Sequence, residues 1–245
     1  MYTEAHRTLL TYIRSVKSLK LQNLLDAFVL ICQRLEVEDE HTMESLNQYI
    51  ADINIQISQQ GFKIERKNDE VDGSLHFIFI NTIVDEIMKE SSMYTTSELV
   101  SIKGIIDDII EASNFEFSTS RATAQQIVHA HQAKGLKEAA AFVDRLIDDG
   151  WFDATLNDRL ILSVKSLCEL KQYLIDGYGS GENDDEDGGG KLLVCRQCKE
   201  IVTMGILTPE KDAFHRKCYE VYCKNSGLPN RESSLMRVGP DLSTL

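Results

Sequence analysis

Two pairs of metal-ligating residues lie near the C-terminus of this 245-residue chain. Two residues separate Cys195 from Cys198, and two separate His215 from Cys218. A Cys-x2-Cys turn can direct both thiolates at one ion, and a His-x2-Cys pair at the start of a helix can supply the other two ligands. The gap of 16 residues between the pairs is close to zinc-module spacing. The pattern predicts one closed, structural zinc site.

Two other interpretations of these cysteines are a disulfide framework and a redox Cys-x-x-Cys motif. A disulfide framework is typical of secreted chains, and the N-terminus has no apolar signal segment. A redox motif opens a helix in a βαβ setting, which the sequence around Cys195 does not predict. Cys223 is a fifth candidate ligand that could replace His215, or it is a free thiol. Cys32 and Cys168 lie in apolar runs and are predicted to be core residues.

The chain is acidic, with a formal charge of −13, and its hydrophobic content of 42% is ordinary for a globular protein. The acidic excess precedes Lys191, whereas the residues from Lys191 onward are mildly basic. An acidic body repels phosphate, so DNA binding by residues 1–181 alone is not expected. No apolar run is long enough to span a membrane. No phosphate-binding loop or catalytic motif occurs, so no catalytic residue is predicted.

The first part of the chain predicts three helices followed by a β-hairpin. The third helix shows the clearest pattern, with Leu46, Ile50, Ile53 and Ile57 on one face. The predicted helices are Ala5–Val16, Leu21–Leu35 and Met43–Ile57, and the predicted strands are Phe62–Arg66 and Leu75–Ile80. Three helices and a two-stranded wing form the winged-helix plan.

The second part of the chain repeats this plan. A capping signal, Thr95 to Glu98, precedes a helix that is predicted to end at Ile110. The other predicted elements are helices Thr119–His131 and Leu136–Asp148, a short wing formed by Trp151–Leu156 and Arg159–Leu162, and a last helix Ser163–Ile175. A winged helix can place a recognition helix in the major groove of DNA or serve as a protein-interaction module. The third helix of the first part has no Lys or Arg, so the protein-interaction role is favoured.

Several motifs resemble those of the non-SMC element one family, the RING-type subunit of the five/six SMC complex. The motifs are Asp52–Ile57 with Gly61–Ile64, Asp149–Asp153, Cys195–Gly205 and Phe214–Tyr222. The resemblance implies a RING-type ubiquitin ligase subunit that works with a MAGE-type subunit, a kleisin subunit and a ubiquitin-conjugating enzyme. It also implies a chromatin-associated, nuclear role in DNA repair and recombination, with DNA contacted only through the complex.

With this resemblance, the predicted fold class is mainly α with small β wings, in two tandem winged-helix domains and a small zinc-binding module. The predicted organisation is a winged-helix domain over 1–92, a second over 93–178, an acidic glycine-rich linker over 179–191, a RING-like zinc module over 192–226 and a flexible tail over 227–245.

The chain departs from the family in half of its ligands. A RING has four ligand pairs that hold two zinc ions, and Cys195, Cys198, His215 and Cys218 correspond to the first and third pairs. The second pair is missing from Ile206–Lys211 and the fourth from Gly227–Ser234. We therefore expect one zinc ion. Gln197 also replaces the apolar residue that usually precedes the second cysteine in the groove for the conjugating enzyme.

Three functions are compatible with these features. The first is a subunit of the SMC complex, stabilised by zinc, whose ligase activity is weak or absent. The second is a working ligase in which packing of Leu207, Leu228 and Leu235, or a partner, replaces the missing loop. The third is a winged-helix nucleic-acid-binding factor, which the negative charge disfavours.

Overall fold

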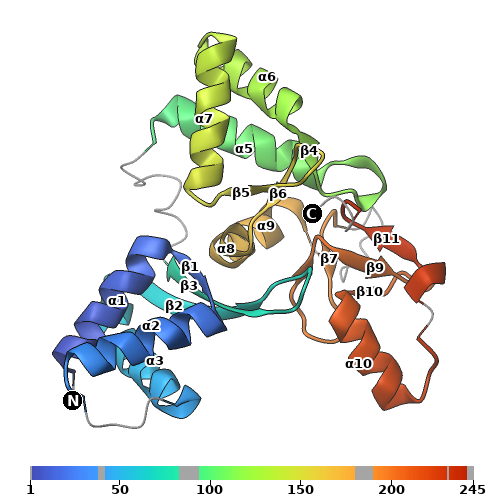
Figure 1. Cartoon of the computed structure of the whole chain (residues 1–245). Helices are drawn as coiled ribbons and strands as arrows, with labels where there is room; N and C mark the ends of the chain where they lie inside the picture. Colours follow the sequence, from blue (N-terminus) through green and yellow to red (C-terminus); the bar gives the residue numbers. More distant parts are fainter. Residues whose placement is uncertain (1, 38–41, 83–93, 180–189, 231, 242–245) are drawn as a thin grey trace. The chain divides into compact units, whose positions relative to one another are not determined.

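The computed structural model describes residues 2–37, 42–82, 94–179, 190–230 and 232–241 (Figure 1). The chain divides into two compact units. The first contains residues 1–69 and 74–89, and the second contains residues 70–73 and 90–245. Most of the predicted linker, residues 180–189, lies outside the described residues. Among the described helices, none has the length and apolar character needed to cross a membrane.

The first unit packs three helices on a small antiparallel sheet. The helices are α1 (Glu4–Val16), α2 (Leu21–Arg34) and α3 (Met43–Ile57). The sheet has the order β1-β3-β2, from β1 (Ser18–Lys20), β2 (Phe62–Asn68) and β3 (Leu75–Asn81). Apolar residues at helical spacing bury one face of each helix, with Leu9, Phe28 and Ile53 almost fully enclosed. The sequence did not predict β1, which adds a third strand to the hairpin.

A partly buried asparagine joins the third helix to the hairpin. The Asn54 amide donates to the carbonyl of Ile64 at 3.0 Å and accepts from the Ile64 N–H at 2.7 Å. Both bonds use backbone groups of β2 that pair with no strand, so the helix fixes the hairpin's position within the unit.

The second unit begins with the same order of elements. Its helices are α5 (Thr96–Ile110), α6 (Arg121–Gln132) and α7 (Leu136–Asp148), and its sheet has the order β4-β6-β5, from β4 (Thr119–Ser120), β5 (Phe152–Ala154) and β6 (Arg159–Leu162). The predicted capping signal is present, because the Thr95 hydroxyl accepts from the Glu98 N–H and Glu98 accepts from the Thr95 N–H. Trp151 is buried, and its indole N–H donates to the Tyr94 hydroxyl. The predicted last helix is instead two helices, α8 (Val164–Glu169) and α9 (Lys171–Tyr178).

The C-terminal part of the second unit consists of short strands around one helix. The elements are β7 (Leu193–Val194), β8 (Ile201–Val202), β9 (Gly205–Leu207), β10 (Ala213–Phe214), α10 (Arg216–Ser226) and β11 (Met236–Val238). The strands form a β7-β8 pair and a β10-β9-β11 sheet.

The prediction of a flexible tail over 227–245 is wrong for the residues of β11. Val238 pairs with Gly205 and is only 1% exposed. The Gly239 N–H donates to the carbonyl of Phe115 at 2.8 Å. The physical reason is that β9 offers a free edge to which a short apolar segment can add. The structured C-terminal module therefore continues beyond the predicted boundary at residue 226.

Candidate metal centre

The first ligand pair lies in the turn between β7 and β8. The Cys195 N–H donates to the carbonyl of Glu200, and the Lys199 N–H donates back to the carbonyl of Cys195, both at 2.8 Å. Lys199 has a left-handed backbone, with φ of 61°, which curls the turn. The Cys195 side chain is buried, whereas Cys198 is exposed. This tight turn directs both sulfur atoms to the same side.

The second ligand pair opens α10. His215 is the N-cap residue, with an extended backbone, and Cys218 follows in the first helical turn. A bridge between Cys195 and Ala213, with the Arg196 N–H donating to the carbonyl of Ala213 at 2.9 Å, places the two ligand pairs next to each other.

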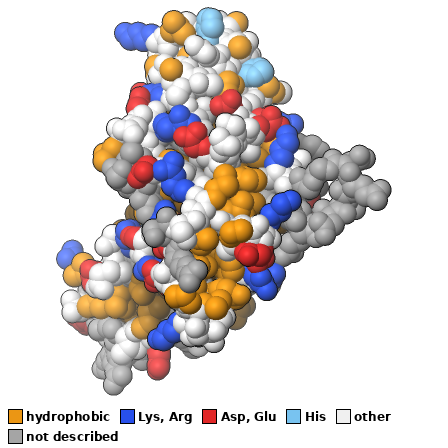
Figure 2. Space-filling model, turned by 90° about the vertical axis from the view of Figure 1, so that its right-hand side faces the viewer, with side chains coloured by type: hydrophobic (Ala, Val, Ile, Leu, Met, Phe, Trp, Pro, Cys, Tyr) orange, Lys and Arg blue, Asp and Glu red, His pale blue; other side chains and the backbone are white. Residues whose placement is uncertain are grey.

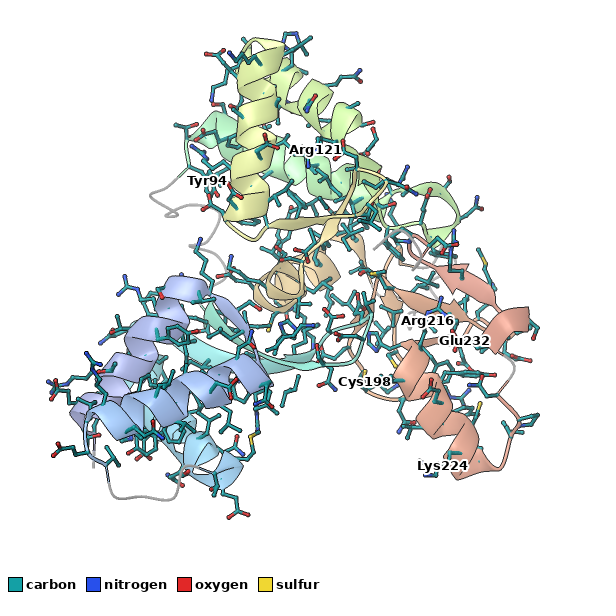
Figure 3. All side chains as sticks on the ribbon, in the orientation of Figure 1. Tyr94, Arg121, Cys198, Arg216, Lys224 and Glu232 are labelled. Carbon is teal, nitrogen blue, oxygen red and sulfur yellow. The ribbon has the colours of Figure 1, made fainter. Side chains whose placement is uncertain are left out.

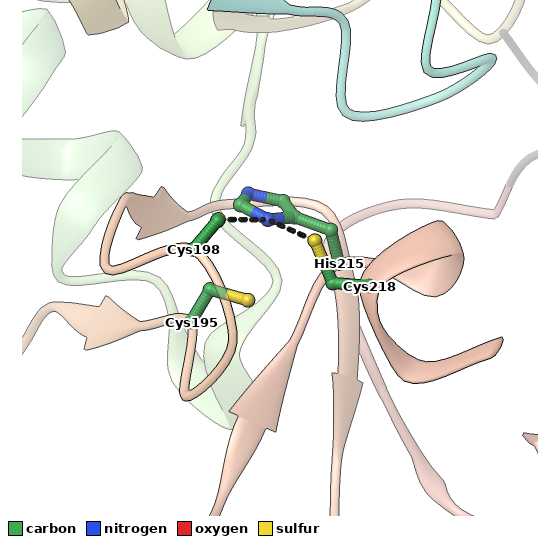
Figure 4. Close-up of side chains that lie close together, drawn as sticks. All are labelled: Cys195, Cys198, His215 and Cys218. Atoms are coloured by element: carbon green, nitrogen blue, oxygen red, sulfur yellow. Dashed lines mark hydrogen bonds between the residues drawn. The ribbon is translucent and has the colours of Figure 1, made fainter. Parts of the chain in front are cut away.

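The four predicted ligands converge on one point (Figure 4). Their ligand atoms all lie within 4.8 Å of one another. The His215 Nδ1 is 3.3 Å from the Cys198 Sγ and 3.8 Å from the Cys218 Sγ. Bonds of about 2.0–2.3 Å to a tetrahedral zinc ion place its ligands about 3.5–3.8 Å apart. Three sulfur atoms and one imidazole nitrogen at these distances fit a metal ion, and this donor set suits zinc.

Hydrogen bonds within the cluster shift the pKa values of its members. The Cys195 thiolate accepts hydrogen bonds from Cys198 and then from His215, and these lower its pKa to about 3 against the opposing effect of burial. The neighbouring thiolate and burial both raise the pKa of Cys198. Burial acts to lower the pKa of His215, but hydrogen bonds with Cys195, Cys198 and Glu70 outweigh it and raise that pKa. A bound metal ion would require the thiolate and neutral imidazole forms of these ligands, so its binding would release protons.

The other candidate cysteines lie outside this cluster. Cys223 is buried on α10, and the metal-capable group of the described residues does not include it. Cys32 is fully buried as predicted, whereas Cys168 is only partly buried.

The segment that should carry the second RING ligand pair forms a tight hairpin instead. The Thr208 N–H donates to the carbonyl of Asp212, and the Lys211 N–H donates to the carbonyl of Thr208, both at 2.9 Å. At Gly205 a methyl group would lie 2.1 Å from the carbonyl oxygen of Phe214, so only glycine permits this approach of β9 and β10. Hydrogen bonds and the close approach of β9 and β10 therefore shape this loop.

An ion pair ties the segment after α10 back to the start of that helix. The Arg216 guanidinium donates to the Glu232 carboxylate, and the two side chains lie side by side in Figure 3. Both are about one quarter exposed, so water screens the pair only partly. Ile206, Leu235 and Arg237 line a pocket together with these two side chains.

One buried carboxylate next to the cluster was not predicted. Glu70 accepts from the His215 Nε2 at 2.9 Å, and it is 8% exposed. It lies in the turn between β2 and β3, where the sequence shows only a polar turn.

Comparison with known proteins assigns the family. Residues 6–170 match the family model described as "Nse1 non-SMC component of SMC5-6 complex". The chain belongs to this Nse1 family. The match ends before Cys195, so the assignment does not depend on the metal cluster.

Nse1 relatives are similar along most of the chain. A Schizosaccharomyces pombe protein named "Non-structural maintenance of chromosomes element 1" is 23% identical over 207 residues, which cover 79% of this chain and 81% of the relative. The Xenopus tropicalis homolog is 24% identical over 208 residues, which cover 82% of this chain and 72% of the relative. A chain of a solved Nse1-Nse3-Nse4 complex has the same fold, with a TM-score of 0.77 and 17% identity over 98% of this chain and 99% of that one.

Proposed function

We propose that this chain is the Nse1-type subunit of an SMC5-6 complex and that it binds a MAGE-type subunit (Nse3) and a kleisin subunit (Nse4). The observation that carries the proposal is likeness over nearly the whole chain. A chain of an Nse1-Nse3-Nse4 complex has the same fold across 98% of this chain, including the C-terminal module.

Co-expression tests this assembly. The full chain, produced with the Nse3-type and Nse4-type proteins of its own organism, should co-elute with them in size-exclusion chromatography. Elution of the chain as a separate monomer in the presence of both would contradict the proposal.

The proposed cellular setting of the chain is nuclear chromatin, where it would act in DNA repair and recombination. A cell that lacks the chain should therefore become sensitive to DNA-damaging agents.

The two helix-and-sheet parts act in this proposal as winged-helix modules that bind proteins. Each has three helices and a three-stranded sheet that includes a hairpin. The charges support protein rather than DNA partners, since α3 has no Lys or Arg. On α7, Arg145 donates to Glu98 at 2.9 Å and lies over the Tyr94 ring, so its charge is already compensated.

The Cys195, Cys198, His215 and Cys218 cluster is proposed to hold one structural zinc ion. Elemental analysis of the purified chain should give one zinc per chain, and a double Cys195→Ser, Cys198→Ser variant should give none. Two zinc ions per chain would overturn the single-site proposal, because the described residues offer one metal-capable group.

Ligase activity is proposed to be weak, with the chain acting mainly as a zinc-stabilised subunit. A RING ligase positions a charged conjugating enzyme, a proximity effect that needs a well-formed docking groove. Here Gln197 is exposed where an apolar residue would belong, and a short hairpin replaces one zinc loop. An autoubiquitination assay with the Nse3-type partner should therefore give little product. Strong activity that the double cysteine variant abolishes would instead support the working-ligase alternative.

A further inference from the structure

Glu70 is far from the candidate metal centre in sequence but next to it in space. It lies in the turn Glu70–Gly73 between β2 and β3, and this turn groups with the second unit. It appears as the teal loop above the His215 ring in Figure 4. The Glu70 side chain is 4% exposed. A carboxylate that is this deeply buried needs partners for both of its oxygens.

Those partners come from the metal module. The Glu70 Oε1 accepts from the Thr203 N–H at 3.0 Å and faces the His215 Nε2 at 2.9 Å. The Oε2 accepts from the Thr203 hydroxyl at 2.5 Å. The turn also packs closely at its other end, because a methyl group on Gly73 would lie 2.4 Å from the Lys217 Cδ. Lys217 lies between His215 and Cys218 in the sequence.

The contact with Glu70 determines which nitrogen of His215 is available to a metal. The Nε2 faces two acceptors, the Glu70 carboxylate and the carbonyl of Ile201 at 3.1 Å, so it carries the proton and donates. The Nδ1 then presents its lone pair to the three cysteines. A carboxylate behind a ligating histidine fixes its tautomer and ring orientation and makes it a stronger ligand.

We propose that Glu70 is a positioning residue for the metal ligand His215, so that the turn between β2 and β3 forms part of the metal centre. This inference rests on the proposed zinc site and adds an outer ligand shell from a segment 145 residues earlier in the sequence. Metal binding and docking of the turn are then linked, and each stabilises the other.

Zinc affinity of the full chain, measured by competition with a chromophoric chelator, tests the proposal. Glu70→Gln should weaken zinc binding about 10- to 100-fold, the usual effect of losing an outer-shell partner. Glu65→Gln is the matched control, because Glu65 lies on the same hairpin, is about one third exposed and pairs with Lys63. Its zinc affinity should equal that of the wild type.

Repeating the Glu70→Gln substitution in a His215→Cys variant shows whether Glu70 positions the histidine or supports the fold in general. In His215→Cys the site has four thiolates and no imidazole to orient, so adding Glu70→Gln should cause no further loss of zinc affinity. A loss of the same size in both backgrounds would overturn the proposal and assign Glu70 to holding Thr203 alone.

The visible spectrum of the cobalt-substituted protein gives a further readout. Glu70→Gln should shift the d–d bands of the three-sulfur, one-nitrogen site, whereas Glu65→Gln should leave them unchanged. If wild type and Glu70→Gln bind zinc equally tightly with identical cobalt spectra, the positioning role is refuted while the zinc site stands. If the wild type binds no zinc, both the proposed zinc site and the proposed role of Glu70 are refuted.

Discussion

His6 is a buried histidine whose environment favours the neutral ring. Its ring stacks on Tyr49 at 4.0 Å, and its Nδ1 accepts from the Thr3 N–H at 3.1 Å, where it completes the cap of α1. Burial lowers the pKa of His6 below its ordinary value of 6.5, and the carboxylate of Asp52 offsets this only in part. Protonation of the His6 ring would create a charge in a buried position. It would also remove the Nδ1 acceptor that caps the helix.

The stability of the first unit should therefore fall in mild acid. The pKa of His6 is lower in the folded than in the unfolded state, so its contribution is complete above about pH 6.5 and is lost as the pH falls towards the folded pKa. The slope is at most about 1.4 kcal/mol per pH unit for one group. Urea unfolding followed by circular dichroism should show this loss in the wild type relative to His6→Asn, which keeps an acceptor but does not titrate. Parallel pH profiles for the two proteins would contradict the prediction.

Among the helices and strands, the elements with long apolar patterns were predicted more accurately than the short ones. The bounds of α3 and α7 were predicted as found, because each carries a one-faced apolar stripe over three or more turns. The short strands β1 and β4, of three and two residues, were missed, since such lengths hold no periodicity. Their existence depends on pairing with β3 and β6.

In the candidate metal site, too, some residues could be predicted from the sequence and others could not. The clustering of Cys195, Cys198, His215 and Cys218 could be predicted because each pair is local and its spacing has a chemical meaning. Glu70 could not, because its role depends on contact with a residue that is distant in sequence. The edge position of β11 was likewise invisible, since only the open edge of β9 explains it.

The C-terminal strand should be sensitive to one methyl group. Gly239 has φ of 81°, and an added Cβ would lie 2.4 Å from the carbonyl oxygen of Thr203. Gly227 has a similar φ of 65° but open space around it. A left-handed backbone costs an alanine about 1–2 kcal/mol at either position. Only Gly239→Ala also forces the chain after β11 away from its neighbour.

Thermal unfolding and limited proteolysis can compare the two variants. Gly239→Ala should lose at least about 2 kcal/mol and become cleavable near β11, whereas Gly227→Ala should lose about 1 kcal/mol and stay resistant. Equal losses would show that the close approach to Thr203 does not matter.

At the scale of the whole molecule, the division into two units predicts where metal removal is felt. Binding of structural zinc to small modules contributes about 10–16 kcal/mol, so a module built on the cluster should not stay folded without metal. After treatment with a chelator, amide hydrogen exchange should accelerate in 192–241 and in the turn at 70–73. Protection of α1, α2 and α3 in the first unit should remain. Loss of protection throughout the chain would mean that the two units unfold together.

Surface charge supports the protein-binding role at this scale. On the face drawn in Figure 2, basic and acidic side chains alternate, with hydrophobic side chains exposed between them. A protein that neutralises phosphates needs clustered Lys and Arg. The net charge of −13 disfavours direct contact between this chain and DNA phosphates.

The bond between Glu70 and His215 also has a consequence for the order in which the chain matures. The ribosome synthesises Glu70 long before His215, so the bond between the two residues can form only late in synthesis. Closing a loop of this length is entropically costly and slows folding. The first unit should therefore reach its fold early, while metal capture is the last step. In a nascent chain halted before residue 215, the Glu70 carboxylate would stay hydrated and the turn would lack its partner.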